Sequence, residues 1–147
     1  MLDYRPKTVK QLQSWYNSKV KEGTSDFTDL NDFLEWHSQQ GKACHYCGLL
    51  EEESQALVMK GVLTSNRFPQ KGVIGRGTSR GTWLEIDRAE PKGKYSRKNS
   101  VLCCYFCNND KSDIFSADQY KRFVPDRPGF LRTILKDITS DGQPSEC

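Results

Sequence analysis

The sequence predicts a small α+β domain with short strands in its middle and helices on both sides. Helical periodicity marks both ends of the chain, and a strand-like alternation occurs around Leu84. Two Cys-x-x-Cys pairs enclose the strand region. Only 35% of the 147 residues are hydrophobic, so the core is small for this length. Domains of that kind often add a metal or a partner subunit.

Two helices are expected in an N-terminal helical segment, residues 1–41. Apolar residues recur at helical spacing after Thr8, a residue type that favours the N-cap position, and the pattern stops at Gly23. A second set spans residues 30–37 and is followed by Gly41. Both helices are amphipathic, which means that one face of each packs on the rest of the domain.

Residues 42–124 are expected to form the functional core. Residues 51–60, "EEESQALVMK", predict a short helix whose first turn is acidic, as the helix dipole favours. Residues 61–81 are rich in glycine and cations and show no periodicity. They predict a long loop, and long loops are usually functional or mobile.

Two short strands are expected at the centre of this core. "TWLEIDR" alternates apolar and polar side chains, which predicts a half-buried strand. Leu84 and Ile86 fall on its buried face. Glu85 and Asp87 fall on the opposite face, so Asp87 is expected to point out of the core. "SVLCCYF" predicts the second strand, and "PKGKYSRKN" connects the two.

Helices are expected again towards the C-terminus. "CNNDKSDIF" can begin one helix, and "SADQYKRF" another with Ser116 as its N-cap. Residues 125–138 predict a C-terminal amphipathic helix, and residues 139–147 predict a disordered tail. No repeat and no second domain is indicated, so the whole chain is expected to form one domain.

The N-terminal residues carry no long apolar run, and no stretch approaches the length of a membrane span. A soluble, cytoplasmic protein without a signal peptide is therefore expected. Cysteines stay reduced in that compartment, and clustered cysteines there more often bind metal than form disulfides.

The paired cysteines predict a tetrahedral structural zinc site, formed by Cys44, Cys47, Cys104 and Cys107. Cys103 is a competitor for Cys104, which is preferred because its two-residue gap to Cys107 matches the first pair. Cys103 is then a buried free thiol, and Cys147 lies in the tail. An iron–sulfur cluster is left open by the ligands alone. Zinc held by four thiolates has no open position, so it stabilises the fold and the chemistry must lie elsewhere.

The charge of the chain is unevenly distributed. The net charge is only +3, yet residues 57–100 hold ten Lys or Arg against three acidic residues. A basic middle between acidic flanks suggests a surface that faces phosphate. On charge alone, a solvated loop surface explains the same pattern equally well.

The order of the motifs resembles the HNH nuclease family, also called ββα-metal or His-Me finger nucleases. The resemblance covers about residues 42–123 and rests on a Cys-x-x-Cys pair, "LEIDR", a loop, "KN" and "CYFCNNDK". Family members hold one divalent cation between two strands and a helix, and many carry two zinc knuckles around that site. The resemblance implies a ββα-metal core stapled by a four-cysteine zinc site, with flanking helices. It also implies a metal-dependent DNA endonuclease that hydrolyses phosphodiester bonds.

The resemblance assigns roles to particular residues. Asp87 and Asn108 would bind the cation, Asn99 would pin the loop to the site, and Lys111 would face a phosphate. Carboxylate and amide oxygens are hard ligands that suit Mg²⁺ or Mn²⁺. Each residue also has a plainer explanation, since Asp87 can form a surface ion pair and Asn108 can cap a helix.

Arg88 departs from the common family pattern, which has a histidine directly after the aspartate as general base. Arginine cannot accept a proton at working pH. His37 and His45 occur elsewhere in the sequence. The pattern is most similar to a branch with Asp-Arg followed by a tyrosine, to which some rare-cutting restriction enzymes belong. In that branch the tyrosine takes over the role of the base, and Tyr95 is the matching residue here.

Three functions compete at this level. A restriction-like, site-specific nuclease acting on double-stranded DNA uses all the motifs. A catalytically inactive zinc module that binds nucleic acid would not require Asp87, Tyr95 and Asn108 at the positions of the nuclease motif. A protein-interaction zinc domain leaves the basic segment unexplained. Many site-specific members of the family pair two subunits to cut both strands, so the resemblance allows a homodimer, although the sequence shows no recognisable dimer surface. The residues expected to contact DNA are Arg67, Lys71, Arg76, Arg80, Lys94, Arg97, Lys98 and Lys111.

Overall fold

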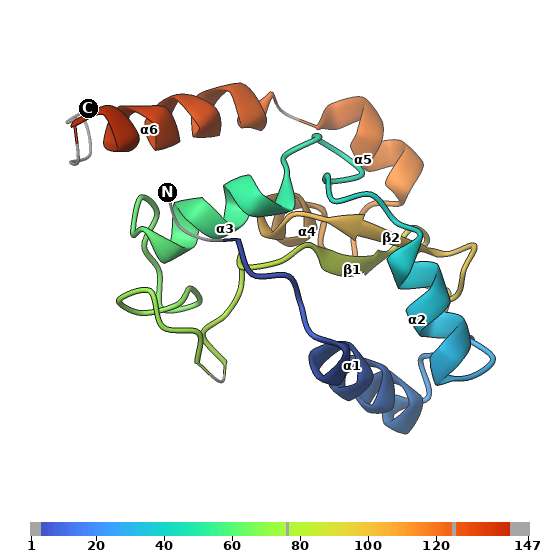
Figure 1. The fold of residues 1–147 in the computed structure, drawn as a ribbon. Coiled ribbons are helices and arrows are strands. Elements are labelled where there is room, and N and C mark those ends of the chain that lie inside the picture. Colours follow the sequence, from blue (N-terminus) through green and yellow to red (C-terminus); the bar gives the residue numbers. More distant parts are fainter. Residues whose placement is uncertain (1–3, 76, 125, 142–147) are drawn as a thin grey trace.

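The computed structural model describes residues 4–75, 77–124 and 126–141, and it confirms the α+β class (Figure 1). The elements before the strands are α1 (Val9–Glu22), α2 (Leu30–Ser38) and α3 (Glu51–Met59). The strands are β1 (Glu85–Arg88) and β2 (Ser100–Cys103). The elements after them are α4 (Tyr105–Lys111), α5 (Ala117–Phe123) and α6 (Arg127–Asp141).

The two strands form an antiparallel sheet in which Glu85 lies opposite Cys103 and Asp87 opposite Val101. A two-stranded sheet is marginally stable on its own and needs a packing partner. Helix α4 supplies one, because it follows β2 directly and packs against β1. Figure 1 shows this ββα unit in the middle of the molecule, with α1 and α2 below it and α5 and α6 above it.

The helix boundaries follow the expected caps. The Thr8 hydroxyl accepts a hydrogen bond from the Gln11 amide, and Gly23 ends α1 with a φ of 74°, a left-handed conformation that glycine adopts without strain. Asp29 caps α2 through the Asp32 amide. Ser116 caps α5 as expected. The loop over residues 61–75 and 77–81 carries only isolated β-bridges, which confirms the prediction of an irregular segment.

An aromatic cluster attaches the N-terminal helices to the strand region. Trp15 of α1 stacks on Phe33 of α2, with ring centroids 5.1 Å apart. The Tyr95 amide donates to the Thr24 carbonyl over 2.9 Å, and the Asp26 amide donates to the Tyr95 carbonyl over 2.7 Å. These bonds dock the β1–β2 loop onto the turn between α1 and α2, so the N-terminal segment fixes the backbone at Tyr95.

Three expectations are corrected. Asp87 does not point into solvent: it is 8% exposed, because α4 and the first cysteine turn cover it. The second strand ends at Cys103 instead of continuing through residue 106, and α4 begins at Tyr105 rather than at Cys107. Helix α6 covers Arg127–Asp141 rather than 125–138, so residues 139–141 are helical and not tail. The rest of the expected tail, with Cys147, lies outside the described residues. None of the described helices is long and apolar enough to cross a membrane.

Candidate active site

The four predicted cysteines meet in one cluster. The Sγ atoms of Cys44, Cys47, Cys104 and Cys107 all lie within 4.8 Å of one another. Each pair forms a tight turn in which a backbone amide donates to the first sulfur, from Cys47 to Cys44 over 3.5 Å and from Cys107 to Cys104 over 3.4 Å. Cys103 is fully buried and is not a member of the cluster, in agreement with the preference for Cys104.

The cluster has the dimensions of a zinc site. Zn–S bonds of about 2.3 Å in a tetrahedron place neighbouring sulfurs about 3.8 Å apart, and the Sγ atoms of Cys47 and Cys104 are 3.8 Å apart. Hydrogen bonds from the other thiols lower the pKa of Cys44, and the same contacts raise the pKa of Cys104. One thiolate is thus stabilised at the expense of its neighbours. Only a cation offsets the charge of all four.

Two donors contact the Asp87 carboxylate, one from the first cysteine turn and one from α4. The Tyr46 hydroxyl, between the first two cysteines, donates to Asp87 Oδ2 over 2.7 Å. The Lys111 ammonium, at the end of α4, lies 3.1 Å from the same oxygen. Among the described residues no donor is recorded at Oδ1. The carboxylate is therefore fixed through one oxygen and can offer the other to a cation.

Lys111 does not occupy the phosphate-facing position that the sequence suggests. Its side chain is fully buried, and its ammonium also donates to the Arg88 carbonyl over 3.1 Å. A buried ammonium needs such partners, because an unpaired charge in the interior is costly. Lys111 therefore orients Asp87 and the end of β1 from inside the protein.

Asn108 lies one turn before Lys111 on the same helix and faces the other end of β1. Its Nδ2 donates to Glu85 Oε1 over 2.8 Å. Glu85 in turn accepts two bonds from the Arg80 guanidinium, 2.6 and 2.7 Å long. Sequence reasoning missed Glu85 and Tyr46. Glu85 shares the outward face of its strand with Asp87, which is a weak signal, and nothing in the sequence singles out Tyr46.

Tyr95 is brought to the end of β1, beside Arg88. The Arg88 guanidinium carbon lies 5.2 Å from the Tyr95 ring centroid, and its Nη1 donates to the Gly93 carbonyl over 3.3 Å. Trp15 meets the ring edge-on at 5.0 Å, and the Lys19 ammonium lies 5.5 Å from the centroid. Burial raises the pKa of Tyr95, and the positive charge of Arg88 opposes that shift. The phenol is thus neutral at pH 7 without further positive charge.

Asn99 shapes the loop that carries Tyr95. Its Nδ2 donates to the Glu90 and Lys94 carbonyls over 3.1 and 3.0 Å, and its Oδ1 accepts from the Glu90 amide over 2.8 Å. It therefore closes the loop onto itself. Gly93 packs against this side chain so closely that a Cβ there would lie 2.7 Å from Asn99 Nδ2.

Four of the residues predicted to be catalytic line one hollow of about 150 Å³, namely Asp87, Arg88, Tyr95 and Asn108. It is lined by Ile86, Asp87, Arg88, Pro91, Tyr95, Asn108, Ser112 and Asp113. A larger groove of about 710 Å³ adjoins it between α1, the loop around residues 74–80 and β1. Ile86, Tyr95 and Asn108 line both. The small hollow therefore opens beside a groove large enough for part of a polymer.

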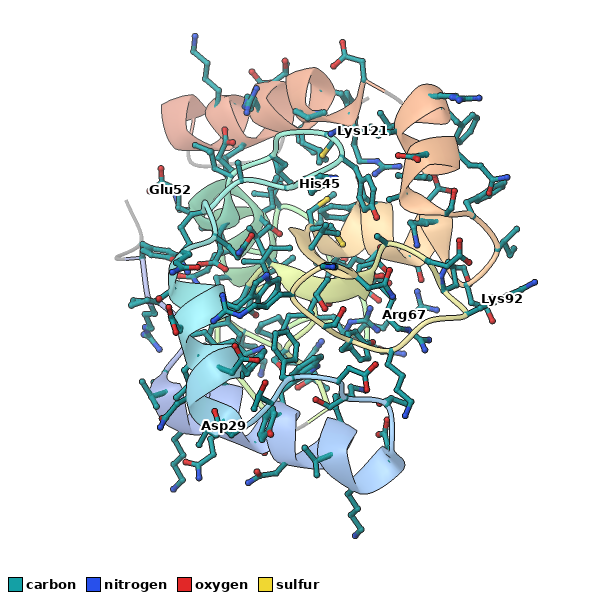
Figure 2. All side chains as sticks on the ribbon, turned by 90° about the vertical axis from the view of Figure 1, so that its right-hand side faces the viewer. Asp29, His45, Glu52, Arg67, Lys92 and Lys121 are labelled. Atoms are coloured by element: carbon teal, nitrogen blue, oxygen red, sulfur yellow. The ribbon has the colours of Figure 1, made fainter. Side chains whose placement is uncertain are left out.

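Neither histidine lines the hollow. His37 is buried against Phe33 and Trp36, and burial together with nearby Lys42 and Lys7 lowers its pKa to about 4. His45 is exposed beside Lys121, and burial of part of its ring lowers its pKa. Figure 2 labels His45 near Lys121, away from the loop tip at Lys92. Tyr95 lines the hollow, and its role as the base stays a prediction from the sequence resemblance.

The basic residues divide into two groups. Arg67 donates to the Tyr105 hydroxyl over 2.7 Å, Arg80 pairs with Glu85, and Arg97 pairs with Asp32 over 2.6 Å. Lys71, Lys94 and Lys98 are exposed. Arg76 lies outside the described residues. The three arginines are exposed but already bonded to other side chains, which leaves the lysines as the freer candidates for phosphate contacts.

Comparisons with known proteins bear on the fold of the chain. No protein-family model and no curated protein matches the chain. Among solved structures, the rare-cutting HNH restriction endonuclease PacI is similar, with a TM-score of 0.56 and 25% identity over 92% of this chain and 82% of PacI. The similarity confirms the resemblance to this kind of enzyme and supports a nuclease-type function.

Proposed function

We propose that this protein is a metal-dependent endonuclease that hydrolyses phosphodiester bonds in double-stranded DNA. The observation that carries the proposal is the hollow in which Asp87, Arg88, Tyr95 and Asn108 meet at the junction of β1 and α4. The similarity to PacI adds support. A restriction-like, site-specific role and pairing of two subunits belong to the same proposal.

In this mechanism Asp87 Oδ1 and the Asn108 amide oxygen would hold Mg²⁺ or Mn²⁺, for which oxygen ligands are suited. The cation, when bound, polarises the scissile phosphate and neutralises charge that develops on it. Tyr95 takes a proton from the attacking water at the edge of the hollow. Arg88, 5.2 Å from the Tyr95 ring, favours the phenolate and offers donors to the phosphate. Lys94 and Lys98, which are exposed on the loop between β1 and β2, contact the DNA backbone.

Replacing Tyr95 with phenylalanine removes only the hydroxyl. We expect the cleavage rate to fall about 10²-fold or more, which is typical for loss of a general base, with DNA binding nearly unchanged. Because burial raises the pKa of Tyr95, the wild-type rate should still be rising with pH above neutrality, as the phenolate fraction grows. Single-turnover rates between about pH 6 and 9.5, on the acid side of a phenol's usual pKa, measure both effects.

Tyr16→Phe is the matched control. Tyr16 lies on α1 and stacks on Phe33, outside the hollow. Its substitution should leave the rate and the pH profile unchanged. A Tyr95→Phe protein that cuts at a rate close to wild type would show that Tyr95 only packs or stacks on DNA.

A catalytically inactive zinc module that binds nucleic acid is the second candidate. The observation that favours it is the environment of Tyr95, whose pKa is raised by burial although a general base requires the opposite. The two functions are separated by one sample of zinc-loaded protein on a pool of labelled duplexes long and varied enough to contain rare target sites. A gel shift in a chelator measures binding, and a denaturing gel after addition of Mg²⁺ or Mn²⁺ measures cleavage. Binding followed by cleavage supports the endonuclease, whereas binding alone supports the module.

A further inference from the structure

Glu85 accepts hydrogen bonds from two different parts of the molecule. Asn108 Nδ2 of α4 reaches Oε1 over 2.8 Å. The Arg80 guanidinium reaches both oxygens, with Nη2 2.7 Å from Oε1 and Nε 2.6 Å from Oε2. The Glu85 side chain is 17% exposed. A carboxylate this enclosed has a defined position, and so do the groups bonded to it.

The hydrogen bond between Asn108 and Glu85 determines whether the oxygen or the nitrogen of the Asn108 side-chain amide faces the hollow. A carboxylate only accepts hydrogen bonds, so Nδ2, and not Oδ1, must face Glu85. The terminal torsion of asparagine is broad and nearly two-fold, so an isolated side chain takes both orientations. Glu85 and Arg80 line the groove, Asp87 lines the hollow, and Asn108 lies between them and lines both. With its nitrogen engaged on the groove side, the amide oxygen is left for the hollow.

We infer that Glu85 is a positioning residue for the catalytic cation: it orients the Asn108 amide so that Oδ1 is presented to the ion beside Asp87. The inference rests on the proposed function. Glu85 acts through Asn108 and is not itself a ligand. Groups that orient metal ligands in this way typically contribute 10- to 100-fold, as an order of magnitude, to affinity or activity.

Arg80 completes the arrangement by offsetting the charge of Glu85. Its guanidinium carbon lies 4.7 Å from the Tyr105 ring centroid, and Arg67 donates to the Tyr105 hydroxyl over 2.7 Å. Tyr105 is the first residue of α4 and is buried. The long basic loop is therefore fastened to the helix that carries Asn108. With two guanidinium bonds on its carboxylate, Glu85 does not compete with Asp87 for the cation.

The test measures Mn²⁺ binding to the zinc-loaded protein from the free-ion signal in electron paramagnetic resonance. Glu85→Ala removes the acceptor, and we expect the dissociation constant to rise about tenfold or more. Glu85→Gln keeps an oxygen that can accept from Asn108, and its dissociation constant should stay within about threefold of wild type. If Glu85→Ala weakened Mn²⁺ binding only by disturbing the fold, Glu85→Gln would not restore the affinity, because glutamine cannot retain both guanidinium bonds with Arg80.

Two control variants make the outcome decisive. Glu52→Ala removes an exposed carboxylate of α3, at the opposite edge of the molecule from Lys92 (Figure 2), and should bind Mn²⁺ like wild type. Asp87→Asn should lose binding. If Asp87→Asn loses binding while Glu85→Ala binds like wild type, the inference is overturned and the proposed function stands. If wild type binds no Mn²⁺, both are overturned.

A swapped pair keeps the test valid if Glu85→Ala does not fold. In the double variant Glu85→Gln/Asn108→Asp, the new amide nitrogen can donate to the new carboxylate, which still gives an oxygen to the hollow. We expect Mn²⁺ affinity equal to or above that of wild type, because a carboxylate is the stronger ligand for hard cations. Affinity about tenfold below wild type in this folded variant, the loss expected for a misplaced ligand, would overturn the inference.

Discussion

Replacing Asp87 with asparagine is expected to lower the rate of DNA cleavage at least about 10³-fold while the protein stays folded. A divalent cation contributes several kcal/mol of transition-state stabilisation, and each 1.4 kcal/mol, roughly, is a factor of ten in rate. Asparagine keeps the shape of the side chain and loses the charge that binds the ion. DNA binding should be largely retained.

Asparagine is a better choice than alanine because of Lys111. That ammonium is fully buried and lies 3.1 Å from Asp87 Oδ2. Alanine would leave it without this partner, and breaking a buried pair typically costs about 3–5 kcal/mol. Loss of activity in Asp87→Ala could then reflect unfolding, whereas an amide oxygen still accepts from Lys111 and Tyr46.

The measurement is single-turnover cleavage with saturating Mn²⁺, alongside thermal unfolding and a gel shift in a chelator. Asp118→Asn, on the exposed first turn of α5, is the control for loss of one carboxylate and should cut like wild type. If Asp87→Asn binds DNA and cuts within about tenfold of wild type, a loss too small for a missing catalytic cation, the cation is not held by Asp87.

Removing zinc is expected to have the largest effect on stability. Purified protein should carry one zinc per chain, and Cys104→Ser or a strong chelator should unfold the domain. Structural zinc supplies folding free energy of roughly 10 kcal/mol in small domains, which is comparable to the whole stability of a domain. Cys104 also caps α4, and the turn between Cys44 and Cys47 carries Tyr46 to Asp87. Loss of zinc therefore disturbs the active site together with the fold.

Cys103→Ser provides the matched control. Cys103 is as buried as its neighbour but lies outside the cluster. Its substitution should keep the zinc and cost about 1–3 kcal/mol for burying a hydroxyl. Metal analysis and thermal unfolding followed by circular dichroism compare the two variants. Zinc lost from Cys103→Ser, or a Cys104→Ser protein as stable as wild type, would show that the ligand set is wrong.

The features that could be predicted from the sequence are those set by local spacing. Thr8, Gly23 and Ser116 end their helices as expected, because caps depend on a few neighbouring backbone groups. Each Cys-x-x-Cys turn fixes the spacing of its own two sulfurs, and two such turns together predicted the four-cysteine cluster that the structure contains. The alternation around Leu84 and Ile86 placed a strand correctly, although the observed β1 begins at Glu85.

The features that could not be predicted depend on how α4 packs against β1. Asp87 and Ile86 do lie on opposite faces of β1, as the alternation predicted, but α4 and Tyr46 cover the face of Asp87 as well. The same packing buries Lys111, which helical spacing alone would leave at the surface. Charge counting also could not show that the exposed Arg80 is engaged by the Glu85 carboxylate. Partners for long side chains are chosen by tertiary contacts, which periodicity does not encode.

The proposed endonuclease activity is tested most directly by cleavage of a supercoiled plasmid library with long genomic inserts, which together contain rare target sites, before and after metal exchange. Zinc-loaded protein is treated with a mild chelator that removes loosely bound Mg²⁺ and Mn²⁺ but leaves the cysteine-bound zinc, and is then supplied with either cation. Hydrolysis that depends on Asp87 and Asn108 predicts no nicking after chelation and nicked or linear plasmid once Mg²⁺ or Mn²⁺ is restored. Full nicking by the chelated protein, or a library in which every plasmid stays intact with both cations present, would contradict it.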